Sequence, residues 1–185
     1  MGDVGRMSTL RVNSIGSQEK STSSSIYRFQ TQFIINNDNV GGKTLNTTSF
    51  QEVASDMRIS ITPSYIDSLI LIKYHFLFGG SNSTLVRHFK IRNVTTSTDV
   101  DLGHSAQGSR TNMHASHRNQ DYDANDVDML TVEAAEISGS TTARTYGLFF
   151  KLESGSDDSY FNHTTTDTAA IGYVKPMITI QEMSK

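Results

Sequence analysis

The sequence predicts an all-β fold, a β-sandwich with jelly-roll-like connectivity, and three observations support this prediction. Short segments rich in β-branched and aromatic residues recur along the chain, separated by turn-forming residues. Several of these segments alternate strictly between apolar and polar residues, as half-buried strands do. Ser, Thr and Asn are abundant, and no segment has the pattern of a long helix.

The length and composition of the chain limit the classes of protein to which it can belong. The chain has 185 residues, enough for one domain with a substantial core. Its formal net charge of -3 gives no basic footprint for nucleic acid, so no nucleic-acid partner is expected. It contains 0 cysteines, which excludes disulfides and thiolate zinc sites. Lys73 interrupts the longest apolar run, so no membrane partner is expected.

The chain divides into an N-terminal arm with its linker, residues 1–25, and a β domain, residues 26–185. Leu10, Val12 and Ile15 are the apolar positions of the arm, and a polar linker follows them. We expect this arm to bind another chain by adding a strand to its sheet. The alternative is that it forms an edge strand of its own domain. The first residues lack the apolar core of a signal peptide, so synthesis in a cytoplasm is expected.

Residues 57–78 are predicted to form the centre of the domain. Residues 57–61 alternate as a strand, and Pro63 then breaks the pattern. Residues 69–78 follow as a core strand rather than a helix, because β-branched and aromatic residues dominate them. One face of this strand, from Ile70 to Phe78, is wholly apolar. The other face, from Leu69 to Leu77, is mixed and is expected to become wet, or to meet another chain, towards its end.

The other strands are predicted from similar segments. Met129 begins a segment that also fits a short helix, although a strand is favoured. Pro176 indicates a bulge or a sheet edge in the last segment, and residues 153–168 are predicted to be a polar loop. The expected segments are 26–35, 45–53 with Phe50 and Val53 inward, 85–94, 129–137, 143–152 and 170–183.

Several short motifs resemble a group of small phage virion surface proteins, found among marine and cyanobacterial phages as tail-fibre tips, head fibres and capsid decorations. The segments that carry the resemblance are residues 8–15 (STLRVNSI), 47–50 (TTSF), 60–64 (SITPS), 68–72 (SLILI), 144–148 (RTYGL) and 178–183 (ITIQEM). It covers most of residues 45–183, except the central segment 95–128, which matches no pattern of the group.

The resemblance implies a jelly-roll subunit that forms a homotrimer on the virion surface. Its expected role is that of a non-enzymatic structural protein, as a capsid decoration or head fibre or as a tail-fibre component. Its expected partners are its own copies and other virion proteins of the capsid or the tail. The resemblance does not distinguish a head location from a tail location.

A second functional hypothesis is a tail-fibre tip that binds a receptor or a host surface glycan. Tyr122, Tyr160 and Phe161 are the candidate rings for stacking on sugars, and they fit equally well as packing residues under long loops. A polysaccharide-degrading enzyme is a third hypothesis. The chain has no nucleophile elbow, no phosphate-binding glycine loop and no recognisable carboxylate pair, so no catalytic residue is assigned.

Metal binding and cofactors are not expected. His104, His114, His117 and His163 are favoured as ordinary neutral histidines, although histidines can meet on the axis of a trimer. Residues 121–125 imitate the start of a calcium loop. The sixth position is Asp126 instead of glycine, and the closing glutamate is out of place. A solvated acidic loop is favoured over a looser site that uses Asp121, Asp123 and Asp126.

Overall fold

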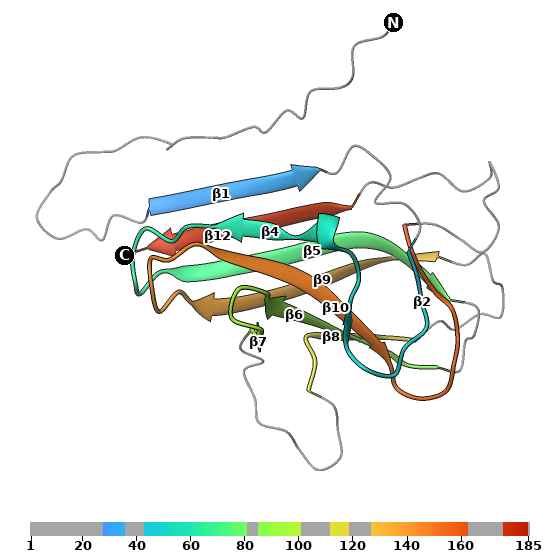
Figure 1. The fold of residues 1–185 in the computed structure, drawn as a ribbon. Coiled ribbons are helices and arrows are strands. Elements are labelled where there is room, and N and C mark those ends of the chain that lie inside the picture. The colour runs from blue at the N-terminus through green and yellow to red at the C-terminus, as the bar shows by residue number, and fades with distance from the viewer. Residues whose placement is uncertain are drawn as a thin grey trace, which may run out of the picture.

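The protein is an all-β sandwich of two sheets, each built from antiparallel strands (Figure 1). The computed structural model describes residues 28–35, 43–80, 85–100, 112–118, 127–162 and 176–184. In those ranges no helix is long and apolar enough to cross a lipid bilayer. The predicted arm, residues 1–25, lies outside the described residues.

The first sheet is organised around β5 (Leu69–Gly80), the longest described strand. β9 (Val127–Ile137) pairs with one edge of β5 along its length. On the other edge, β12 (Met177–Ser184) pairs with the first part of β5, and β1 (Arg28–Ile35) pairs with β12. The end of β5 pairs with β11 (Ser159–Phe161), which in turn pairs with β2 (Lys43–Leu45).

The second sheet is organised around β10 (Arg144–Leu152). On one side it pairs with β6 (Arg87–Asn93), and on the other with the short strands β3 (Gln51–Glu52) and β4 (Ile59–Ile61). β7 (Thr98–Asp99) and β8 (Ala115–His117) pair with β6.

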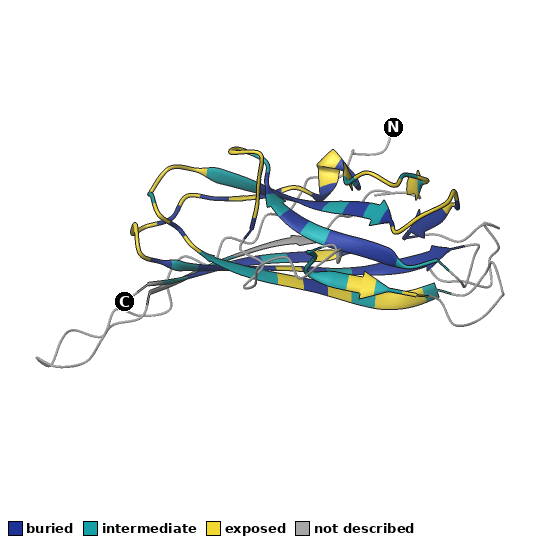
Figure 2. Ribbon diagram, turned by 90° about the horizontal axis from the view of Figure 1, so that it is seen from below, coloured by how far each residue is buried: buried dark blue, intermediate teal, exposed yellow. Residues whose placement is uncertain are grey.

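The core fills the space between the two sheets. The predicted inner face of β5, from Ile70 to Phe78, is buried, and so are Tyr146, Leu148, Phe150 and Leu152 of β10. Figure 2 shows such buried positions along the strands of both layers. Five phenylalanine rings form the centre of the core, with ring centroids 5.1–6.4 Å apart. They are Phe76, Phe78, Phe89, Phe150 and Phe161. The alternation in the sequence thus identified both core strands correctly.

Several predicted elements differ in the structure. The expected strand 45–53 is divided between β2 and β3, which belong to different sheets, because the chain crosses between layers there. Val53 is buried as predicted, but Phe50 lies on the outside of the second sheet, against Lys90 and Lys151. The strand expected from residue 57 begins only at Ile59, after a single 3-10 turn, although Met57 is buried as its alternation predicted.

Two predictions about the C-terminal part are also corrected. The expected loop 153–168 contains β11, which lies buried at the end of β5. Pro176 precedes β12 instead of interrupting it, and β12 lies between two strands rather than at an edge. A proline just before the first residue of a strand removes no ladder hydrogen bond. The segment 129–137 is a strand, as was favoured, and begins two residues earlier.

Candidate interaction surface

The outer face of the first sheet, here called the first-sheet face, is formed by the side chains that alternate with core residues on β5, β9 and β12. The strand register places Ile137 beside Leu69 and Glu133 beside Lys73. The outward positions are Leu69, Leu71, Lys73, His75 and Leu77 of β5, Met129, Thr131, Glu133, Ala135 and Ile137 of β9, and Met177, Thr179, Gln181 and Met183 of β12. They make one continuous surface.

The first-sheet face exposes large apolar side chains. Ile137 is 60% exposed, Met129 42% and Met177 38%, and these are three of the five exposed large hydrophobic residues in the described ranges. Leu69 and Leu71 are half-buried between them. Large apolar side chains exposed together on one sheet face are typical of sites of protein association. The structure therefore has the mixed face that was predicted for β5, but the last residue of that face, Leu77, is buried instead of exposed to solvent.

The middle of the first-sheet face carries one pair of opposite charges. Lys73 Nζ lies 2.7 Å from Glu133 Oε1, and both side chains are about half exposed. Next to them, His75 Nδ1 lies 2.9 Å from Thr131 Oγ1. An exposed pair of this kind adds little to the stability of an isolated chain. The position of this ion pair at the centre of an apolar surface is therefore better explained by contact with another molecule that covers the surface.

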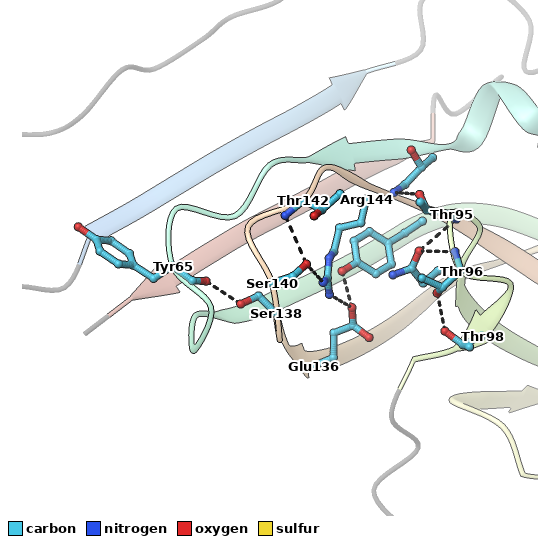
Figure 3. A network of polar contacts seen from close by, with 12 residues as sticks. Tyr65, Thr95, Thr96, Thr98, Glu136, Ser138, Ser140, Thr142 and Arg144 are labelled. Carbon is cyan, nitrogen blue, oxygen red and sulfur yellow. Dashed lines mark hydrogen bonds and ion pairs between the residues drawn. The ribbon is translucent and has the colours of Figure 1, made fainter.

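A loop at one end of the sandwich, residues 62–68, is held by a buried carboxylate. Glu182 of β12 is 1% exposed, and its Oε1 accepts hydrogen bonds from the backbone N–H of Ser64 at 2.6 Å and from Ser68 Oγ at 2.6 Å. Its Oε2 accepts from Ser64 Oγ at 3.0 Å. Ser138 Oγ also donates to the carbonyl of Tyr65 at 2.7 Å, a contact that Figure 3 shows. The loop is thus fixed from two strands.

The fixed loop presents two apolar side chains to the outside. Ile66 is 63% exposed and Tyr65 39% exposed. Sequence reasoning did not single out Glu182, although its position contained the signal. It follows Ile178 and Ile180 at the core-facing positions of an alternating strand, where a carboxylate needs hydrogen-bond donors.

A second polar network joins the two sheets beside the turn between β9 and β10 (Figure 3). Glu136 Oε1 accepts from Arg144 Nη1 at 2.9 Å and from the hydroxyl of Tyr146 at 2.6 Å. Arg144 Nη2 donates to Ser140 Oγ at 3.1 Å. Burial and the neighbouring carboxylate of Glu136 raise the pKa of Tyr146, so its hydroxyl stays protonated and donates. These hydrogen bonds connect β9 to β10, which indicates a structural role for the network.

A third charged group lies in the interior. Arg87 is fully buried, and its Nη2 lies 2.5 Å from Asp157 Oδ2, while its Nε donates to Ser159 Oγ at 3.1 Å. Burial lowers the pKa of Arg87, and the carboxylate of Asp157 opposes that shift. Gly80 makes room for the guanidinium, since an added Cβ would lie 2.1 Å from Arg87 Nη2. The ion pair between Arg87 and Asp157 connects β6 to the segment before β11.

The outer face of the second sheet has a different character, because its charged side chains cover its aromatic rings. Lys90 Nζ lies 2.6 Å from Asp99 and 4.5 Å from the centre of the Phe50 ring. Arg92 Nε lies 2.9 Å from the same aspartate, and its guanidinium lies over Phe149. Such a face is well suited to water, whereas the first-sheet face is not.

The predicted ligand-binding rings do not form an exposed site. Phe161 is 1% exposed and packs in the phenylalanine cluster, and Tyr160 is also buried. A buried ring offers no face on which a sugar could stack, so the structure supports the packing role for both residues. Tyr122 lies outside the described residues, as do Leu10, Val12 and Ile15 of the arm.

The described histidines lie in separate contacts. His114 Nδ1 accepts from the backbone N–H of Ile91 at 3.0 Å, and His117 Nε2 lies 2.7 Å from Asp128 Oδ2. His88 is buried, and its Nδ1 has no hydrogen-bond partner within the described part. In that part, no group of three or more histidine, aspartate or glutamate residues is placed to hold a metal ion. His104, His163 and the acidic residues Asp121, Asp123 and Asp126 lie outside it.

Comparison with known proteins adds no family assignment. No model of a protein family matches the chain, and no curated protein matches it.

Proposed function

We propose that this chain is a non-enzymatic structural protein of the surface of a bacteriophage particle, made in the host cytoplasm and assembled as a homotrimer. It serves as a capsid decoration or head fibre, or as a component of a tail fibre. The first-sheet face is the observation that carries the proposal, because large apolar side chains exposed on one sheet face are typical of surfaces that associate with other chains.

The strand order supports a jelly roll as the finer description of the fold. One sheet contains β1, β12, β5 and β9 in that order, and the other contains β4, β10, β6 and then β7 or β8. If the short strands β2, β3 and β11 are set aside, the remaining strands alternate between the sheets along the chain, except that β6, β7 and β8 follow one another in the second sheet, as two Greek keys require. Jelly rolls are frequent among viral capsid and lectin domains, so this connectivity is compatible with a particle subunit.

The contacts of Glu182 support the resemblance to phage virion proteins. The motif SITPS supplies Ser64, the following motif supplies Ser68, and the C-terminal ITIQEM motif supplies the carboxylate that both serines bind. Motifs more than a hundred residues apart in the sequence therefore form one structural unit. We therefore treat these motifs as one combined sequence pattern, because their residues are joined by hydrogen bonds in the structure.

Particle composition tests the proposal directly. Mass spectrometry of purified virions should find the chain, and electron microscopy of particles with labelled protein should place it on the surface. Hundreds of copies per particle indicate a decoration, and a few tens or fewer indicate a fibre. Absence from washed, purified particles would refute the structural role.

The arm is proposed to attach the domain to a different chain, either a sister subunit or the underlying virion protein. Removing residues 1–20 should leave a folded trimer, because β1 begins only at Arg28, while attachment to particles falls. Light scattering and a particle-binding assay measure the two properties. Unfolding of the shortened chain would make the arm an internal strand, and full attachment would make it dispensable.

A further inference from the structure

We propose that the first-sheet face packs against a second copy of this chain, with Lys73 of each copy placed against Glu133 of a neighbour. This inference rests on the self-association in the proposed function and identifies the surface and the residues that carry it. The occupant is a copy of the chain itself, because the charge pattern of the face is complementary to itself.

The apolar part of the face provides the driving force. Met129 and Ile137 lie near the two ends of β9, and Met177 lies across β5 from β9, so the exposed apolar side chains frame the sheet rather than cluster at one point. Three such faces can meet around the threefold axis of a homotrimer, so that the outward side chains of each copy contact those of its two neighbours. Methionine side chains adapt easily to an opposing surface, which suits a contact between copies.

β1 extends the same sheet on its other side. Its register places Phe29 opposite Met183, Phe33 opposite Thr179 and Ile35 opposite Met177. The surface available to a neighbour is thus the width of four strands, β1, β12, β5 and β9. A stable contact between proteins needs roughly 800 Å² from each partner, and a face of four strands is a suitable platform for that area.

The charges identify the occupant. Lys73 and Glu133 are the two charged residues among the outward positions of β5, β9 and β12. The two pair with each other within the chain, and a cover that removed water from them would leave their remaining hydrogen-bonding groups unsatisfied unless it offered charged partners in return. Identical chains related by rotational symmetry offer both signs to each other at equivalent positions. A partner with one sign of charge would match only half of the pair.

The contrast with the other side of the sandwich supports the same assignment. On the second sheet, Asp99 contacts both Lys90 and Arg92, and the rings of Phe50 and Phe149 are covered by cationic side chains. That face has its exposed rings and charges satisfied within one chain. The first-sheet face leaves its apolar side chains uncovered, so an association that buried only one face would bury this one.

The mass of the full-length protein in solution tests the inference, measured by light scattering across a dilution series. The parent should be an oligomer at micromolar concentration. Ile137→Lys should weaken association by about tenfold or more, as the loss of an anchor residue does. Thr98→Lys is the control, because Thr98 is exposed on β7 of the second sheet, away from the first-sheet face. This control should keep the parent mass.

The charge pair is tested by reversal. Lys73→Glu and Glu133→Lys should each weaken association, because each places like charges at the centre of the contact, and the double reversal should restore it. Thermal melts of the single variants verify that the chains remain folded. If Ile137→Lys and both charge variants keep the parent mass, or if Thr98→Lys dissociates the oligomer equally, the assignment of this face is wrong.

The failure of the inference is distinguishable from the failure of the proposed function. A parent that is a single chain at every concentration refutes the contact and the homotrimer together. Mass spectrometry of virions still reports independently whether the chain is a particle protein. A parent oligomer that survives all changes to the first-sheet face refutes only the inference, and leaves the structural role standing.

Discussion

Glu182 shows how one residue can organise a distant loop. Its carboxylate receives hydrogen bonds from Ser64 and Ser68, which lie more than a hundred residues earlier in the chain. A buried carboxylate requires such donors, and each donor becomes costly if the carboxylate is removed. The loop that carries Tyr65 and Ile66 is therefore ordered by the last strand of the protein and not by its own sequence.

Replacing Glu182 with glutamine should lower the free energy of unfolding by about 1–3 kcal/mol. The amide has nearly the same shape, but it is uncharged and offers one oxygen where the carboxylate offers two. Urea unfolding measures the loss. Glu153→Gln is the control, since Glu153 is exposed and its loss should cost less than about 1 kcal/mol. Equal losses in the two variants would contradict the role assigned to Glu182.

His88 should make the stability of the protein sensitive to acid. Burial lowers the pKa of His88, with Lys151 adding to the shift and Glu153 opposing it. The unfolded chain then binds the proton more readily than the folded chain. The stabilising contribution of neutral His88 is present above about pH 6.5, the ordinary value for histidine, and is lost as the pH falls through the lower folded pKa.

This sensitivity can be measured from melting temperatures at pH 7.5 and pH 5. The difference between them should be smaller in His88→Gln than in the parent, because glutamine does not titrate. If the His88→Gln protein retains the full difference, then the acid sensitivity arises from other groups.

At the scale of elements, predictability followed the strength of local alternation. β5 and β10 were identified with their buried faces because each has long runs of alternating apolar residues. β11 was not predicted, because three residues inside a polar segment carry no periodicity. It is a strand because it fills the position beside the end of β5. The division of residues 45–53 between two sheets likewise depends on tertiary structure rather than on local sequence.

The candidate surface was predictable in part for the same reason. The mixed face of β5 is visible in the sequence from Leu69 to Leu77. Its neighbours Met129, Glu133 and Ile137 are brought there by the register of β9, about sixty residues later, which local patterns do not specify. The sequence thus indicates half of the surface, and the strand pairing supplies the other half.

The buried ion pair between Arg87 and Asp157 connects β6 to the segment before β11. Asp157→Asn should lower the free energy of unfolding by about 3–5 kcal/mol, because it leaves the buried guanidinium without its carboxylate. Asp99→Asn is the matched control, since Asp99 also pairs with an arginine but on the partly exposed second sheet, and should cost about 1 kcal/mol or less. Denaturant unfolding measures the free energy of unfolding of both variants. If Asp157→Asn loses no more stability than Asp99→Asn, the buried pair does not have the proposed importance.

At the scale of the whole molecule, the sandwich is asymmetric. One outer face pairs its charges within the chain, and the other leaves apolar side chains around one exposed ion pair. The fixed loop with Ile66 adjoins the second of these, because Ser138, which follows Ile137, bonds to Ser68 and Tyr65. The molecule therefore has one side suited to water and one suited to assembly.

The position of β12 also has a consequence for how the protein is made. This strand, completed only at Ser184, lies between β1 and β5, so that residues about 150 positions apart, such as Thr31 and Gln181, become neighbours. The first sheet cannot be completed until β12 has been translated, and a chain that stops before it has neither this interior strand nor the carboxylate of Glu182. Pairings over such sequence distances form slowly. A polypeptide that stops before β12 therefore cannot complete the fold, which bars it from any assembly that requires the finished sheet.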